Sequence, residues 1–223
     1  MQNSKLKTHK RPPGRSRVLM RRTAWFVSFE FLLLSFVSAQ QLLDRVLARI
    51  GSNAITLTDV RAAVGLGLVD AKSPDDPAAL SQVIDRQLML TEVARFPPAE
   101  PTAAAIDQQM EAMKKRAGTA LQELMNSTGL DEARLRDLAR DTLRIQAYIM
   151  QRFGTLTIVG EDDARRYYDE HKEQFTRNGM PIPFEDAEAE ARRLASAARL
   201  QDSIAQWVRD LRMRAEVVIV RSR

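Results

Sequence analysis

Apolar residues recur every three or four positions over most of the chain, and this spacing places them on one face of a helix. The pattern predicts helices over residues 77–95, 103–116, 119–126, 132–153, 161–175 and 184–214. Proline or glycine stands in most of the breaks between them, as in KSPDDP and FPPAEP. Asp76, Thr102 and Asp131 are expected to cap three of these helices, because their side-chain oxygens can accept a hydrogen bond from the first helical turn.

Two short stretches near the ends of this helical region have the composition of strands. Arg45–Ile50 is followed by turn residues at 51–53 and a second extended piece, after which Thr58 is expected to cap a helix that begins at Asp59. Val217–Val220 is apolar on both faces, which predicts a buried strand. Pairing the two stretches closes a loop at a cost of roughly 4–5 kcal/mol, which burial of four aliphatic side chains at about 1.5–3 kcal/mol each can offset. We therefore predict a mainly helical fold in which the two end strands form one small sheet.

Residues 1–39 have the pattern of a secretory signal peptide. Two arginines precede the apolar run Ala24–Ala39, and small residues precede the expected cleavage site between Ala39 and Gln40. The run contains Glu30 and is shorter than the stretch of about 20 apolar residues that a membrane-spanning helix needs. We expect cleavage and export to the periplasm. An uncleaved leader that anchors the chain in the membrane is the alternative.

The net charge of +5 would favour nucleic acid or an anionic surface as a partner, but the charges are unevenly placed. Eight of the 34 basic residues and one of the 29 acidic residues lie in 1–39, so residues 40–223 carry 26 basic and 28 acidic side chains. The excess positive charge therefore belongs to the leader, and no nucleic-acid partner is expected. Met20 begins a more ordinary signal sequence, and we hypothesise that translation starts there. Residues 40–223 are long enough for one domain with a core of ordinary size.

The side chains offer little catalytic chemistry. The chain has no cysteine, and His171 is the one histidine of residues 40–223, so His/Cys metal sites and Cys–His nucleophilic pairs are excluded there. His171 lies among charged residues near a predicted helix end, as a solvated histidine does. The acidic runs Asp75–Pro77 and Glu161–Asp163 lie at predicted helix starts, where their charge favours the helix dipole. No catalytic residue, metal or cofactor is predicted.

Several segments together resemble the N-terminal chaperone domain of the SurA-type periplasmic foldases, which is shared in outline with PrsA and PpiD proteins and with the peptide-binding part of trigger factor. The resemblance covers nearly all of residues 42–223. The segments are LLDRVLARIGSNAITLTDV, VIDRQLMLTEVARF, GLDEARLRDLARDTLRIQAYIMQRF and EDDARRYYDEHKEQF. The family's opening pattern, V-A-x-V/I-x-x-x-x-I-x-x-x-D, is matched by Ala48, Ile50, Ile55 and Asp59, with Val46 one position before the place of the pattern's first valine. Its Y-Y-x-x-x-x-x-x-F helix is matched by Tyr167, Tyr168 and Phe175.

In that family, one or two parvulin-type prolyl isomerase domains usually follow the helix that ends in EQF. Here residues 176–183 form only a short connector at this point, because a domain needs at least about 50 residues. The resemblance implies an ATP-independent chaperone that holds unfolded or nascent envelope polypeptides, including outer-membrane proteins, and that has no isomerase activity. A prolyl isomerase acting alone and an accessory subunit bound to one fixed envelope partner are the alternatives.

By the same resemblance, clients would bind in a shallow cleft between the N-terminal helices and the long final helix. Methionine side chains repack readily, which suits an adaptable peptide groove. The helical spacing of the methionines also fits ordinary core packing, so both interpretations stay open. The candidate groove residues are Met110, Met113, Leu121, Leu124 and Met125.

Overall fold

The computed structural model describes residues 44–220, without the side chains of residues 156 and 157. The predicted signal peptide 1–39, its cleavage site between Ala39 and Gln40, and Met20 lie outside the described residues. The fold is mainly helical with a small antiparallel sheet, so the predicted fold class is confirmed. Within residues 44–220, no helix has the combination of length and apolar character that crossing a membrane requires.

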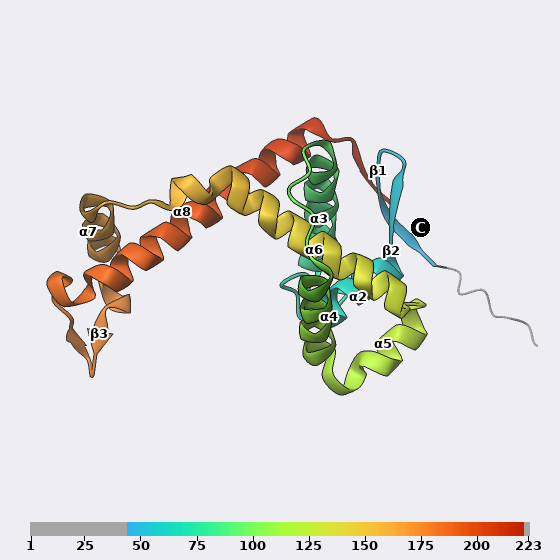
Figure 1. Cartoon of the computed structure of the whole chain (residues 1–223), viewed down its shortest axis with the longest axis horizontal. Helices are drawn as coiled ribbons and strands as arrows, with labels where there is room; N and C mark the ends of the chain where they lie inside the picture. The colour runs from blue at the N-terminus through green and yellow to red at the C-terminus, as the bar shows by residue number, and fades with distance from the viewer. Residues whose placement is uncertain (1–43, 221–223) are drawn as a thin grey trace, which may run out of the picture. The chain divides into compact units, whose positions relative to one another are not determined.

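The strands from the two ends of the described chain pair with each other, as predicted. β1 (Val46–Ile50) lies between β2 (Asn53–Thr56) and β5 (Val217–Ile219) in an antiparallel sheet of order β2-β1-β5 (Figure 1). Ala48 of β1 stands opposite Ile219 of β5. One sheet therefore joins both ends of the helical region.

The prediction that the last strand is buried is wrong. β5 is an edge strand with a neighbour on one side only, and Val218, Ile219 and Val220 are 49%, 60% and 43% exposed. Val217 alone is half-buried and packs against the core. The unbroken apolar run therefore forms an edge strand in which only the first side chain is partly buried.

The first helix begins two residues earlier than predicted. The cap of α2 (Leu57–Gly65) is Thr56, whose hydroxyl accepts a hydrogen bond from the Asp59 backbone N–H at 3.3 Å. The Asp59 carboxylate accepts one from the Thr56 N–H at 3.0 Å, which completes a capping box. Thr58, the predicted cap, instead donates its hydroxyl and its N–H to the Asp44 carboxylate. It therefore ties the chain before β1 to α2.

The other helices follow the predicted spacing, and Asp76, Thr102 and Asp131 cap α3, α4 and α6 as expected. These helices are α3 (Pro77–Arg95), α4 (Ala103–Ala117), α5 (Leu121–Thr128), α6 (Glu132–Phe153), α7 (Glu161–Glu170) and α8 (Phe184–Arg214). Three short 3-10 turns and a small hairpin complete the described chain: η1 (Gly118–Ala120), η2 (Gly154–Thr157), η3 (Lys172–Gln174), β3 (Thr176–Arg177) and β4 (Met180–Pro181). α7 does not continue to Phe175 as predicted, because His171 leaves the helical conformation with φ −130° and ψ 38°.

The connector between α7 and α8 reverses the chain, as predicted, and it does so as a β-hairpin. Asn178 and Gly179 form its turn with positive φ angles of 54° and 80°, and Asn-Gly is the pair that two-residue hairpin turns favour. At the base of the hairpin, the Ile182 N–H donates to the Phe175 carbonyl at 2.8 Å. The Tyr168 hydroxyl donates to the Ile182 carbonyl at 2.6 Å, so the hairpin is fastened to α7.

Buried side chains gather in three clusters. The first joins the sheet to α2, α3, the end of α6 and the last turns of α8 around Trp207. The second lies between α4, α5 and α6 around Met113. The third packs α7 and the hairpin against the first half of α8 around Phe175. α8 contributes to the first and third clusters, and Figure 1 shows it running from α7 and β3 to the sheet.

Candidate functional site

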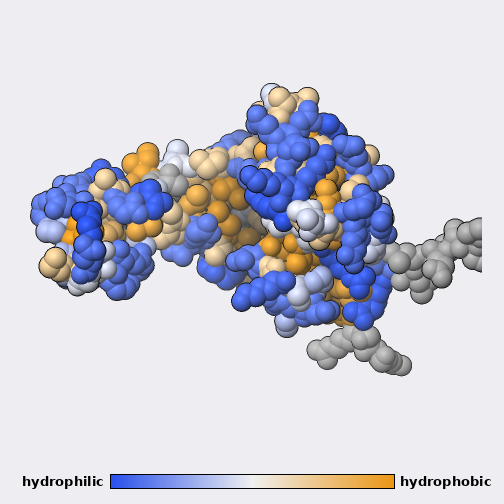
Figure 2. All heavy atoms as spheres, turned by 90° about the horizontal axis from the view of Figure 1, so that it is seen from below, coloured by the Kyte–Doolittle hydropathy of each residue, from blue (hydrophilic) through white to orange (hydrophobic). Residues whose placement is uncertain are grey.

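A cleft of about 670 Å³ lies between α3, α6 and α8, and we call it the α8 cleft. Its volume is within the range of about 300–1,000 Å³ that is usual for ligand pockets. The apolar part of its wall consists of Leu68, Val69, Met89, Ile145, Ile204, Ala205 and Val208. The uncharged polar part consists of Ser81, Gln82, Thr142, Gln146 and Gln201, and the charged part of Asp85, Arg86, Arg209 and Arg212. On the face seen in Figure 2, apolar side chains gather around a hollow, with polar side chains over most of the remaining surface.

Helical spacing places these residues in the wall of the cleft. On α3 and on α8 the residues of the cleft wall recur at intervals of three and four. They form a stripe on each helix beside the stripe of buried core residues. Arg212 links the two helices at the cleft. Its guanidinium donates to the Ser81 carbonyl at 2.9 Å, to the Ser81 hydroxyl at 2.7 Å and to the Asp85 carboxylate. The cleft thus has a fixed polar contact in its wall.

Arg86 of α3 lines the α8 cleft and also a second cavity of about 680 Å³ between β2, α2, α3 and α6. Its Nη2 donates to the Leu138 carbonyl at 3.3 Å and to the Thr142 hydroxyl at 2.9 Å. Among residues 44–220, no carboxylate oxygen lies within 4.0 Å of its guanidinium nitrogens. Burial lowers the pKa of Arg86, and the more distant charge of Asp141 only partly opposes this effect. The guanidinium is therefore a largely buried charge without a contacting counter-ion.

The second cavity holds acidic and basic groups together. Burial raises the pKa of Asp141, although the positive charges of Arg86, Arg144 and Arg134 act in the opposite direction. Asp59, Asp131, Asp141, Arg134 and Arg144 all line this cavity in addition to Arg86. Its charges are thus balanced in number, whereas the α8 cleft has three arginines and one aspartate.

The predicted groove residues come together in one place, but that place is not the α8 cleft. Met110 and Met113 are 3% and 0% exposed and lie in the cluster between α4, α5 and α6. Leu121, Leu124 and Met125 of α5 are half-buried and pack against the same cluster. Met110 and Met113 are therefore core residues, which was the other interpretation of the methionine spacing.

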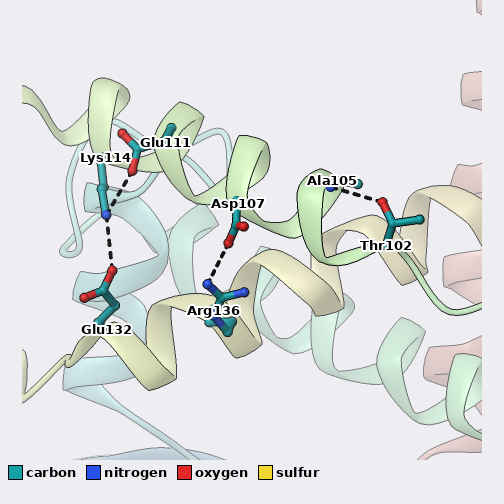
Figure 3. Close-up of polar contacts among 7 residues, drawn as sticks. All are labelled: Thr102, Ala105, Asp107, Glu111, Lys114, Glu132 and Arg136. Carbon is teal, nitrogen blue, oxygen red and sulfur yellow. Dashed lines mark hydrogen bonds and ion pairs between the residues drawn. The ribbon is translucent and has the colours of Figure 1, made fainter.

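Ion pairs on the outside of this cluster hold α4 against α6 (Figure 3). Arg136 contacts Asp107 at 2.6 Å, and Lys114 lies 3.5 Å from Glu132. A hydrogen bond from Lys114 to Glu111 raises the pKa of Lys114, with both glutamates adding to the effect. These contacts bridge the two helices, and the methionines belong to the apolar cluster between them.

Only some residues of the α8 cleft could be predicted from the sequence. Ile204 and Val208 belong to the apolar pattern predicted for the last helix. The sequence analysis did not identify Arg86 as a candidate site residue. The sequence feature that could have indicated it is a single arginine between apolar positions, in VIDRQLML.

His171 lies outside the α8 cleft. The His171 ring stacks on Tyr167 with centroids 4.1 Å apart, and its Nδ1 lies 2.9 Å from the Tyr167 carbonyl oxygen. Within the described part of the chain, no group of three or more His, Cys, Asp or Glu side chains could hold a metal ion.

No protein-family model matches this chain, and no curated protein matches it.

Proposed function

We propose that this protein is an exported, ATP-independent chaperone that holds unfolded envelope polypeptides, including outer-membrane proteins, in the α8 cleft. The observation that supports this most is the wall of the cleft, to which α3, α6 and α8 each contribute apolar side chains and which also contains glutamines that can bond to a peptide backbone. The cleft also lies between the N-terminal helices and the last long helix, where the resemblance to SurA-type foldases expects clients. The leader 1–39 supports a periplasmic location.

The size of the cleft is consistent with weak, reversible holding. Burying about 200 Å² of apolar peptide surface would contribute roughly 5 kcal/mol at about 25 cal/mol per Å². Association and ordering of the peptide cost several kcal/mol or more, so the net affinity of one segment is low. A long unfolded client offers many such segments in turn. It can therefore be retained and then released without ATP.

Suppression of client aggregation tests the proposal. An unfolded outer-membrane protein is diluted from urea, and light scattering is recorded with and without the purified protein. Ala205→Glu places a charge at an exposed position in the cleft wall, and it should abolish suppression. Met213→Glu is the matched control, because Met213 lies on the same helix, is 77% exposed and is outside the cleft. Full suppression by a folded Ala205→Glu protein would remove the cleft from the proposal.

The α5 surface remains a second candidate for client binding. Leu121, Leu124 and Met125 are half-buried, so a double substitution to glutamate there can be tested in the same assay. Met110 and Met113 are unsuitable for this test, because a charge at a core position would unfold the domain. Loss of suppression at α5, with full activity of Ala205→Glu, would move the client site from the α8 cleft to α5.

Two further measurements separate this proposal from its alternatives. We expect a protease-coupled proline-isomerisation assay to give the background rate, and a rate above background would support the isomerase alternative. A pull-down from envelope extract should recover many unfolded clients in small amounts. A single stoichiometric partner would favour an accessory subunit instead.

A further inference from the structure

We propose that the α8 cleft selects peptide segments in which a carboxylate lies beside apolar side chains, and that Arg86 binds this carboxylate. The inference rests on the proposed function, because it names a class of client segment for the same cleft. The carboxylate can belong to an aspartate or glutamate side chain or to a chain terminus.

The first argument is the unused binding capacity of Arg86. A guanidinium has five N–H donors and a planar edge that matches both oxygens of a carboxylate. Only Nη2 of Arg86 is engaged among the described residues, and both of its acceptors, the Leu138 carbonyl and the Thr142 hydroxyl, are uncharged. Since a buried charge is costly without a partner, a carboxylate in the cleft would relieve that cost.

The second argument is the charge of the cleft wall. Arg86, Arg209 and Arg212 face it together with a single acid, Asp85. Asp85 already accepts a hydrogen bond from Arg212, so it is not available to Arg86. The remaining polar wall is uncharged. The cleft therefore complements an anion.

The third argument concerns the side from which the ligand enters. In the second cavity, three aspartates balance Arg86 and two further arginines, so this cavity has no excess positive charge to attract a carboxylate. In the α8 cleft the corresponding wall is formed by apolar residues such as Met89, Ile204 and Val208. A segment entering there can bury apolar side chains while its carboxylate reaches Arg86. Apolar contacts would then provide most of the affinity, and the ion pair would provide the selectivity.

The test uses fluorescence anisotropy with three labelled ten-residue apolar peptides that differ in one group each. The first has an internal glutamate and an amidated C-terminus, the second replaces the glutamate with glutamine, and the third keeps the glutamine but has a free C-terminal carboxylate. The protein is purified from cells that express the full chain. We expect the glutamate peptide to bind roughly tenfold tighter than the glutamine peptide, since a charge-assisted bond adds about this much. Tighter binding of the third peptide alone would support the inference with a chain terminus as the source.

Two variants assign the preference to Arg86. Arg86→Met keeps the length of the apolar stem and should make the peptides bind equally, whereas Arg209→Gln, at an exposed position in the same wall, should leave a clear preference for glutamate. If Arg86→Met does not fold, Arg86→Lys retains the charge without the bidentate geometry and should show a reduced preference.

The outcomes separate this inference from the proposed function. Equal binding of all three peptides to the unaltered protein would overturn the carboxylate preference and leave the chaperone proposal intact. A preference that survives in Arg86→Met would overturn the role of Arg86. Binding of none of the peptides, together with no suppression of client aggregation, would overturn both proposals.

Discussion

Trp207 of α8 stacks on Tyr148 of α6, with ring centroids 5.3 Å apart and ring planes inclined by 25°. Phe153, at the end of α6, also contacts this indole, with ring centroids 5.7 Å apart. Trp207 is 3% exposed. Because α8 also forms one wall of the α8 cleft, this aromatic contact helps to fix the position of that wall.

Replacement of Trp207 should therefore be among the most destabilising single changes. We expect Trp207→Ala to lower the free energy of unfolding by about 3–5 kcal/mol, from lost burial and a cavity. Trp207→Phe should cost clearly less, because it keeps an aromatic ring and because Nε1 of Trp207 has no hydrogen-bond partner among the described residues. Urea unfolding followed by circular dichroism measures both. Equal losses for the two variants would mean that ring stacking contributes little.

The two isoleucines of the sheet should respond very differently to truncation. Ile50 of β1 is 8% exposed, whereas Ile219 of the edge strand β5 is 60% exposed. We expect Ile50→Ala to cost about 2–5 kcal/mol, and Ile219→Ala to remain within roughly 0.5 kcal/mol of the unaltered protein. Urea midpoints of the two variants provide the comparison. A large loss at Ile219 would indicate that another surface covers β5 in solution.

This contrast shows what the sequence could and could not predict. Helices, most of their caps and the pairing of β1 with β5 follow from local spacing and from the need to bury apolar residues. The exposure of β5 does not follow, because the apolar pattern of Val217–Val220 is compatible with a central strand and with an edge strand. Likewise, Thr56 and Thr58 both have the chemistry of a cap, and only the position of Asp44 assigns Thr58 another partner.

The candidate site was harder to predict for a related reason. A helix such as α3 has one stripe in the core and another beside it, and which one borders a cleft depends on the helices packed around it. Met110 and Met113 satisfied the chemical criterion for a groove but lie in the core. The surroundings of Arg86 likewise depend on α6, which provides its uncharged acceptors.

The hairpin between α7 and α8 should tolerate the insertion of a folded domain. Its turn residues Asn178 and Gly179 are exposed, and its base is closed by hydrogen bonds at Ile182. We expect insertion between Asn178 and Gly179 to shift the melting temperature of the host by only a few degrees, since the loop tip has no core contacts. The same insertion between Gly129 and Leu130 should lower it much more, because Leu130 is 6% exposed. Thermal melts of the two chimeras measure the two shifts in melting temperature, and equal shifts would contradict the prediction.

Asp141 should make the protein less stable as the pH rises. Burial raises the pKa of its carboxyl above the ordinary value of 3.8, despite the attraction of Arg86, Arg144 and Arg134. The unfolded chain therefore loses this proton at a lower pH than the folded protein does. The stability associated with Asp141 is complete below pH 3.8, falls as the pH rises through the raised pKa and is constant above it.

We expect Asp141→Asn, which keeps the shape of the protonated carboxyl, to be more stable than the unaltered protein at neutral pH. This advantage should shrink as the pH falls toward 3.8. Asp163 provides a control of opposite sign, because a hydrogen bond from Arg199 at 2.7 Å lowers its pKa. Asp163→Asn should therefore be less stable at neutral pH, with a deficit that shrinks as the pH falls through the lowered pKa. Urea unfolding across the pH range measures both differences in stability. If both variants were less stable than the unaltered protein at neutral pH, the prediction that burial disfavours the charged form of Asp141 would be contradicted.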